Sequence, residues 1–186
     1  MNSLENMSLE ELWRLFPVML VKHDNRWTDI AKEEIKRLHS GLRLKAIKIH
    51  HIGSTAVRDI MAKPIVDLLV EVPENVKFES LKKTIIDLGY ICMSETAERL
   101  SFNRGYTVKG YAKEVFHLHL RHPNDNDEIY FCEYLNRYPE VAKEYEALKN
   151  ILAEKYKYNR DAYTMSKTSF VNRYTELGKQ CKMQDS

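Results

Sequence analysis

The chain has 186 residues, of which 44% are hydrophobic and 30% charged, a balance typical of one folded domain that buries its own core. Its 29 Lys and Arg residues stand against 27 Asp and Glu residues, and the resulting net charge of +2 argues against binding to long nucleic acid or to an anionic membrane surface. Cys92, Cys132 and Cys181 are odd in number and far apart, which argues against a secreted disulfide framework.

The amino-terminal residues contain acidic side chains and no long apolar run, so they resemble neither a secretory signal nor an anchor. No segment has the roughly 18 to 20 apolar residues that span a bilayer. We therefore expect a cytoplasmic protein without a membrane partner.

Ser8 and Glu11 have the spacing of a capping box, and the apolar repeat from Leu9 to Phe16 predicts a helix that Pro17 ends. Residues 1–17 are thus predicted to be a helical extension.

The next part of the chain predicts alternating strands and helices. A short strand is expected over Val18–Val21, followed by a helix that opens at Asp24 or Asn25 and is closed by Gly41. Further expected elements are a strand over Leu44–Ile49, a buried strand over Ile65–Val72, a helix from Phe78 that Gly89 ends, strands over Leu100–Asn103 and Val115–Leu120, and a hairpin connection over Gly105–Gly110.

After a loop over His122–Asp127, the chain reads as helix to about Lys179, with breaks near Pro139 and near Tyr158 and Asn159. Mixed strands and helices followed by a helical carboxyl-terminal third indicate an α+β fold, in which helices flank a small mixed β-sheet. We expect one domain over residues 18–180 and a tail over residues 181–186.

One segment carries the chemistry. Gly53, Ser54 and Thr55 lie between a predicted strand and a short helix, where backbone N–H groups and a hydroxyl favour an anion. Such a triplet is also an ordinary helix cap. Asp67 lies on a predicted buried strand, where a carboxylate requires a metal, a cation or a proton. The spacing predicts that Ser54 and Asp67 share one site.

The residues His51-Ile-Gly-Ser-Thr-Ala-Val57 and Ala62-Lys-Pro-Ile-Val-Asp67 closely resemble the signature of the GrpB family, which belongs to the nucleotidyltransferase superfamily. The resemblance runs from about residue 18 to 174. Further matching segments are Asp24–Trp27, His117–His119, the helix from Tyr134 to Lys149, and Tyr163 to Phe170.

The resemblance implies a nucleotidyltransferase-like fold and a catalytic carboxylate at Asp67, where Mg²⁺ or Mn²⁺ would bind. In the superfamily a second acid follows two residues later, and this chain has Leu69 there. Glu71 lies on the same strand face but roughly 13 Å away along it, whereas two catalytic ions lie only about 4 Å apart. We interpret Glu71 as an exposed residue at the strand end.

His117 and His119 are alternate residues of one predicted strand, about 6.6 Å apart on the same face, and can chelate one ion. The resemblance places them on the strand that carries the third superfamily carboxylate. Asp67, His117 and His119 are therefore expected to form one metal site. A structural, hydrogen-bonded histidine pair is the alternative.

The remaining candidate residues are predicted to contact the ligand. Lys63 precedes a proline near the Gly-Ser turn, where its ammonium can meet a phosphate, or it is a surface lysine. His51 either caps the turn or lines the pocket. Lys167, on a predicted helix, is a weaker candidate for a phosphate contact. The expected substrate-binding residues are His51, Gly53, Ser54, Thr55, Lys63 and Lys167.

Two functions follow from these residues. The first is a metal-dependent nucleotidyltransferase-like enzyme whose catalysis is weak or altered because of Leu69. The second is a non-catalytic module that binds a nucleotide or a phosphorylated small molecule, or that serves as an accessory to another enzyme. The resemblance also links the family to coenzyme A metabolism, because the domain occurs fused to dephospho-coenzyme A kinase in some bacteria. In either case we expect a small-molecule partner.

Overall fold

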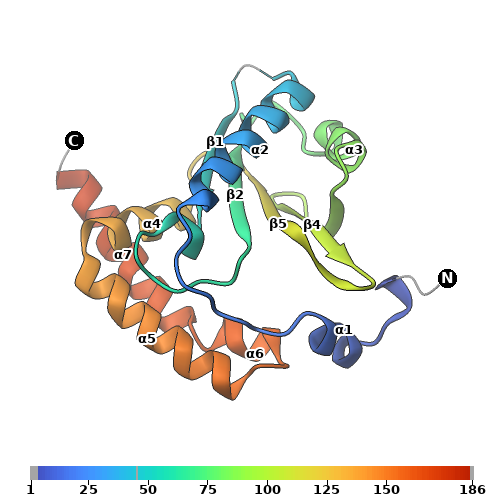
Figure 1. Cartoon of the computed structure of the whole chain (residues 1–186). Helices are drawn as coiled ribbons and strands as arrows, with labels where there is room; N and C mark the ends of the chain where they lie inside the picture. The colour runs from blue at the N-terminus through green and yellow to red at the C-terminus, as the bar shows by residue number, and fades with distance from the viewer. Residues whose placement is uncertain (1–3, 45, 185–186) are drawn as a thin grey trace.

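A five-stranded sheet forms the centre of the molecule, and the computed structural model describes residues 4–44 and 46–184 (Figure 1). The strands have the spatial order β1-β2-β5-β4-β3, in which β2 and β5 are parallel and the other neighbouring pairs are antiparallel. This mixed sheet with flanking helices confirms the predicted α+β class. The strands are β1 (Lys48–Ile52), β2 (Val66–Glu71), β3 (Ile91–Glu95), β4 (Leu100–Thr107) and β5 (Gly110–Arg121).

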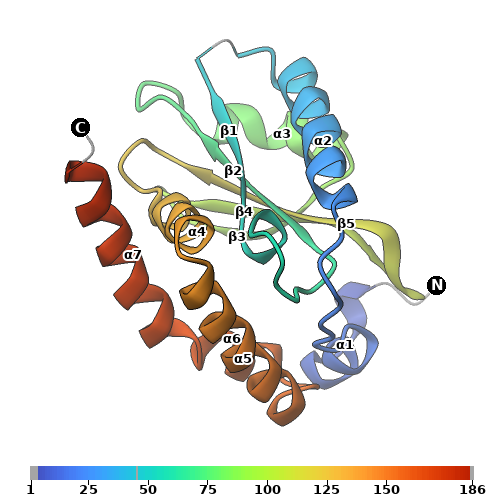
Figure 2. The same ribbon diagram turned by 60° about the vertical axis from the view of Figure 1, so that its left-hand side comes forward.

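The two faces of the sheet have different partners. Side chains alternate along β2, so that Val66, Leu68 and Val70 enter the main hydrophobic core, which helices α2 (Arg26–Leu42) and α3 (Glu79–Asp87) cover. Asp67, Leu69 and Glu71 therefore point to the opposite face, and Leu69 packs there against Ile129. On that face lie the carboxyl-terminal helices, which Figure 2 shows on the far side of the sheet from α2 and α3.

The carboxyl-terminal third forms a second helical layer. It consists of α4 (Asp127–Arg137), α5 (Pro139–Lys155), α6 (Arg160–Met165) and α7 (Thr168–Gln184), with breaks at the predicted places. One further break, between α6 and α7, was not predicted, so Lys167 lies in a turn rather than within a helix. The predicted tail continues α7 to Gln184, and residues 185–186 lie outside the described residues.

The amino-terminal part differs from the prediction in two places. Helix α1 (Leu9–Leu15) has the predicted capping box between Ser8 and Glu11. The expected strand over Val18–Val21 is wrong, because only Val21 pairs, through a single bridge to Ala62. Helix α2 passes Gly41 and ends at Leu42, where Arg43 takes the left-handed conformation that closes it.

The strands differ in extent from the predicted ones. Strand β1 lies later than the expected Leu44–Ile49, of which Lys45 is outside the described residues, and β3 was not predicted. Strands β4 and β5 extend almost through the predicted hairpin connection. Gly105 makes this possible with a φ of 91° at a bulge, since a Cβ there would approach the Glu114 carbonyl oxygen to 2.3 Å.

No helix among the described residues combines the length and the apolar character needed to cross a bilayer.

Candidate functional site

A cavity of about 560 Å³ lies between the second sheet face and the carboxyl-terminal helices. This volume is within the range of small-molecule sites. Residues from both layers line it. They include eight of the nine site residues predicted above, all except His51, namely Gly53, Ser54, Thr55, Lys63, Asp67, His117, His119 and Lys167.

The Gly53 turn brings the cavity floor against Asp67. Ile52, the last residue of β1, pairs with Asp67, and the chain then turns at Gly53 with a φ of 72° and a ψ of −173°. A Cβ on Gly53 would lie 2.4 Å from Oδ2 of Asp67, so only glycine fits. Ser54 and Asp67 thus face one cavity, as the spacing predicts, although the helix after the turn is a 3₁₀ helix of three residues, η2 (Ser54–Ala56).

His51 and Thr55 stabilise the Gly53 turn through hydrogen bonds. The Thr55 hydroxyl donates to the Ile65 carbonyl oxygen at 3.2 Å, so its oxygen accepts from Nε2 of His51 at 3.0 Å. Burial lowers the pKa of His51 to about 4, which keeps this imidazole neutral. The contact of His51 with the turn is the first of its two expected roles, and the Thr55 hydroxyl is already engaged by protein partners.

Asp67 is the first member of a hydrogen-bond chain across the cavity wall. Its Oδ1 lies 2.9 Å from Nδ1 of His117, and Nε2 of His117 lies 2.7 Å from the Tyr106 hydroxyl. Arg160, at the start of α6, donates through Nη2 to the same hydroxyl at 2.9 Å. Burial raises the pKa of Asp67, but the hydrogen bond from His117, together with nearby positive charge that includes Lys63, more than offsets it, so the pKa is lowered and the carboxylate is ionised.

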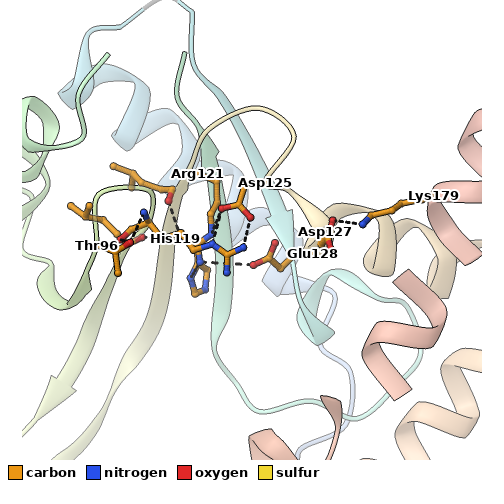
Figure 3. A network of polar contacts seen from close by, with 10 residues as sticks. Thr96, His119, Arg121, Asp125, Asp127, Glu128 and Lys179 are labelled. Carbon is orange, nitrogen blue, oxygen red and sulfur yellow. Dashed lines mark hydrogen bonds and ion pairs between the residues drawn. The ribbon is translucent and has the colours of Figure 1, made fainter. Parts of the chain in front are cut away.

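His119 belongs to a separate set of polar contacts at the cavity edge, which we name the rim network: Arg99, Ser101, His119, Arg121, Asp125 and Glu128. Figure 3 labels four of its members, His119, Arg121, Asp125 and Glu128. Nδ1 of His119 lies 3.2 Å from the Ser101 hydroxyl and 3.5 Å from Nη2 of Arg121. Because Arg121 only donates, this nitrogen is an acceptor. Burial lowers the pKa of His119 to about 4, so the ring stays neutral.

The acids needed for two metal ions are not together on this face. Leu69 is fully buried, and Glu71 is occupied by His50 at 2.7 Å and Asn126 at 2.8 Å. The side chain of Glu71 is only 11% exposed, so its interpretation as an exposed strand-end residue is wrong. Within residues 4–44 and 46–184, no group of three or more His, Cys, Asp or Glu side chains is arranged to hold a metal ion. The residues present do not fit a two-ion centre.

Three basic side chains that line the cavity are named here the cavity cations: Lys63, Arg160 and Lys167. The ammonium groups of Lys63 and Lys167 lie 5.6 and 4.3 Å from the centre of the same Tyr163 ring. Neither lysine has an ion-pair partner in the described part of the chain. Burial, with repulsion by Arg160 and Lys167, lowers the pKa of Lys63 to about 7, and burial lowers that of Lys167 to about 8.

Tyr106, Lys149 and Arg160 were not predicted as site residues. Lys149 is buried in α5, donates to the Met61 carbonyl oxygen, and has a pKa lowered to about 7 by burial and by Lys167. Tyr106 follows the Gly105 bulge, and Arg160 follows the Asn159 cap of α6. An aromatic residue after a strand glycine and a basic residue after a helix cap were the only sequence signals for them.

The comparisons with known proteins agree with this architecture. The family model described as GrpB protein matches residues 17–177. The chain is 33% identical over 161 residues to the glutamate-rich protein GrpB of Alkalihalophilus pseudofirmus, covering 83% of this chain and 92% of that protein. It is 29% identical over 180 residues to the UPF0157 protein YqkA of Bacillus subtilis, covering 94% of this chain but only 52% of YqkA.

Solved structures give the same result at the level of the fold. The crystal structure of the conserved protein GrpB from Enterococcus faecalis matches with a TM-score of 0.77 and 26% identity, covering 89% of this chain and 99% of that one. The Cid1 poly(U) polymerase, described with MgGTP bound, matches with a TM-score of 0.51 and 14% identity over 78% of this chain and 45% of that one. The fold is therefore nucleotidyltransferase-like, and the chain belongs to the GrpB family.

Proposed function

We propose that the cavity binds a small molecule that carries a phosphoryl group, such as a nucleotide or a phosphorylated metabolite. The observation that carries this proposal is the convergence of Lys63 and Lys167 on one ring in the cavity, without a carboxylate partner among the described residues. Buried ammonium groups are unfavourable unless an anion or deprotonation compensates them. A phosphate supplies that compensation, because it accepts charge-assisted hydrogen bonds from both lysines.

The cavity is lined by groups of opposite charge, and this supports a ligand with two chemically different parts. Asp67 and the Gly53 turn line it together with the cavity cations. A free phosphate next to the Asp67 carboxylate is repelled, whereas a hydroxyl or amine can donate to Oδ2 of Asp67. We expect the phosphoryl group at the cations and an uncharged part of the ligand, such as a sugar, beside Asp67.

A divalent ion at Asp67, His117 and His119 has less support. Nδ1 of His117 faces Asp67 and Nε2 faces Tyr106, while Nδ1 of His119 faces Ser101 and Arg121. An ion shared by the three residues requires these hydrogen bonds to break. The proposed binding therefore does not depend on Mg²⁺ or Mn²⁺.

Slow nucleotidyl transfer is the second candidate function. Its support is the position of Asp67 directly beside Gly53 in a nucleotidyltransferase-like fold. Leu69 argues for a low rate, since it removes an acid that would hold a second ion. Incubation with each α-labelled nucleoside triphosphate, Mn²⁺ and small hydroxyl or amine acceptors tests it. Transfer that is lost in Asp67→Ala supports this candidate, and transfer that survives in Asp67→Ala contradicts the site.

The binding proposal is tested by thermal-shift screening of nucleotides, sugar phosphates and coenzyme A precursors, because ligands of the native state raise its apparent stability. The screen is run with EDTA, with Mg²⁺ and with Mn²⁺. Lys167→Met should reduce the shift, and Lys83→Met is the matched control because Lys83 lies exposed on α3. A ligand shift that is equal in both variants would place the phosphate site elsewhere.

A further inference from the structure

We propose that Arg160 is the principal phosphate ligand of the cavity, that Asp67, His117 and Tyr106 position its guanidinium, and that binding requires no divalent ion. This inference rests on the proposed function and deepens it. Asp67 then has a different role from that of a metal-holding carboxylate. It anchors a hydrogen-bond chain that ends at a cation.

The direction of the chain follows from its donors. Arg160 can only donate, so the Tyr106 oxygen accepts from Nη2 of Arg160. The Tyr106 hydroxyl proton is then free to donate to Nε2 of His117 at 2.7 Å. Nδ1 of His117 consequently carries the ring proton and donates to Oδ1 of Asp67 at 2.9 Å. With these donors and acceptors, an unbroken hydrogen-bond chain connects Asp67 to Arg160.

Packing restricts the Tyr106 ring as well. It lies edge-on to Phe16 at 4.8 Å and to Tyr111 at 5.3 Å, and it stacks on His117 at 5.9 Å with an interplanar angle of 16°. The Arg160 guanidinium lies 5.4 Å from the centre of the same ring. Phe16, directly after α1, and residues of the β4–β5 hairpin thus orient a side chain that belongs to α6.

The guanidinium keeps hydrogen-bond donors for a ligand. Of its N–H groups, only one on Nη2 is engaged by Tyr106, and Arg160 has no carboxylate partner within residues 4–44 and 46–184. A planar guanidinium held in this way can bind two oxygens of one phosphate. Lys63 and Lys167 line the same cavity. In other phosphoryl-transfer sites metal ions neutralise the charge of the phosphate, and here these protein cations would do so.

The test is calorimetric titration of pyrophosphate and of ADP, each in EDTA and in excess Mg²⁺. The wild type should bind in EDTA. Arg160→Met should weaken binding by about tenfold or more, and Arg160→Lys should lie between the two, because it keeps the charge and loses the planar fork. Tyr106→Phe should weaken binding several-fold. Tyr90→Phe is the control, since it removes a buried hydroxyl that donates to Glu34 in the core on the other sheet face.

Imidazole ¹⁵N spectra of the wild type supply a readout that does not depend on ligand. His117 should carry its proton on Nδ1, and a proton on Nε2 would overturn the hydrogen-bond chain. Wild-type affinity in Arg160→Met would overturn the inference and leave the proposed function intact. Binding that requires Mg²⁺ would overturn the inference and also the metal-independence of the proposed binding, but not the phosphoryl ligand. Absence of binding of either probe under both conditions would contradict both.

Discussion

The cavity is bordered by two sets of basic residues that differ in their partners. In the rim network, Arg99 donates to both oxygens of Asp125, and Arg121 lies 3.8 Å from Asp125 and 3.9 Å from Glu128. The cavity cations have no such carboxylates in the described part of the chain. A basic residue paired with an acid contributes to the fold, whereas a buried one without an acid is available to an anion.

The largest expected effect is on the stability of the fold, and it concerns Arg121, the buried arginine of the rim network. Arg121→Met removes hydrogen bonds to the Leu100 and Leu120 carbonyl oxygens at 3.2 and 2.8 Å and leaves Asp125 and Glu128 with less compensation. We expect the free energy of unfolding to fall by about 3 kcal/mol. Urea denaturation followed by circular dichroism measures it, and a loss below about 1 kcal/mol would contradict the structural role.

Lys167→Met, unlike Arg121→Met, should lower the affinity for a phosphate ligand without lowering the stability of the fold. The affinity for pyrophosphate should fall about tenfold or more, because a charge-assisted hydrogen bond is lost. The free energy of unfolding should stay unchanged or rise, since a half-buried ammonium that repels Lys63 is removed. Calorimetric titration and urea denaturation measure the two quantities, with Lys83→Met as the control. A marked loss of stability with unchanged affinity would assign Lys167 to the fold.

The affinity for sulfate, whose charge is constant over this range, should fall as the pH rises from about 6.5 to 9. Lys63 and Lys167 lose their protons through pKa values of about 7 and 8, and an anion favours their protonated forms. The decrease should approach tenfold per pH unit for each proton released. Titrations across this range test the prediction, and a pH-independent affinity would contradict it.

The unliganded protein should show the reverse dependence on pH. In the unfolded chain both lysines have pKa values near 10.5, so above about pH 7 the unfolded state binds more protons than the folded state. Their contribution to the free energy of unfolding therefore rises with pH between about 7 and 10. Urea denaturation at several pH values measures this trend, and in Lys63→Met the rise should be smaller.

The smallest effect is expected for Arg99→Ala. The Arg99 side chain is 59% exposed, so its ion pair with Asp125 is screened by solvent. We expect a loss of less than about 1 kcal/mol in the free energy of unfolding. Urea denaturation beside Arg121→Met separates the exposed and buried parts of the rim network, and equal losses would show that burial does not distinguish them.

Part of this site was predictable from local sequence. The strand pattern around Asp67 and the alternation of His117 and His119 predicted a shared sheet face, and the parallel pairing of Asp67 with His117 and of Leu69 with His119 places them there. Gly53 was predicted only as part of a turn that favours an anion. In the structure a glycine is needed at this position for another reason, because its φ is 72° and a Cβ would collide with Asp67. Gly53→Val should therefore reduce stability as well as binding.

Other parts were not predictable, because they depend on contacts between distant segments. Tyr106 lies on a hairpin and Arg160 on the last third of the chain, and only the packed structure joins them. Strand β3 was missed because its residues Ile91 and Met93 are exposed at the sheet edge and give no clear alternation. The break before α7 has neither proline nor glycine as a signal.

The measurement that tests the central claim most directly is the number of protons taken up when ADP binds at about pH 8, obtained from calorimetric titrations in buffers of different ionisation enthalpy. At this pH the terminal phosphate of ADP is already ionised, while Lys63 is mostly neutral and Lys167 is about half protonated. The account predicts that binding takes up protons and that this uptake disappears in the variant Lys63→Met with Lys167→Met. Binding without proton uptake in the wild type, or no binding at all, would contradict a phosphate site at the cavity cations.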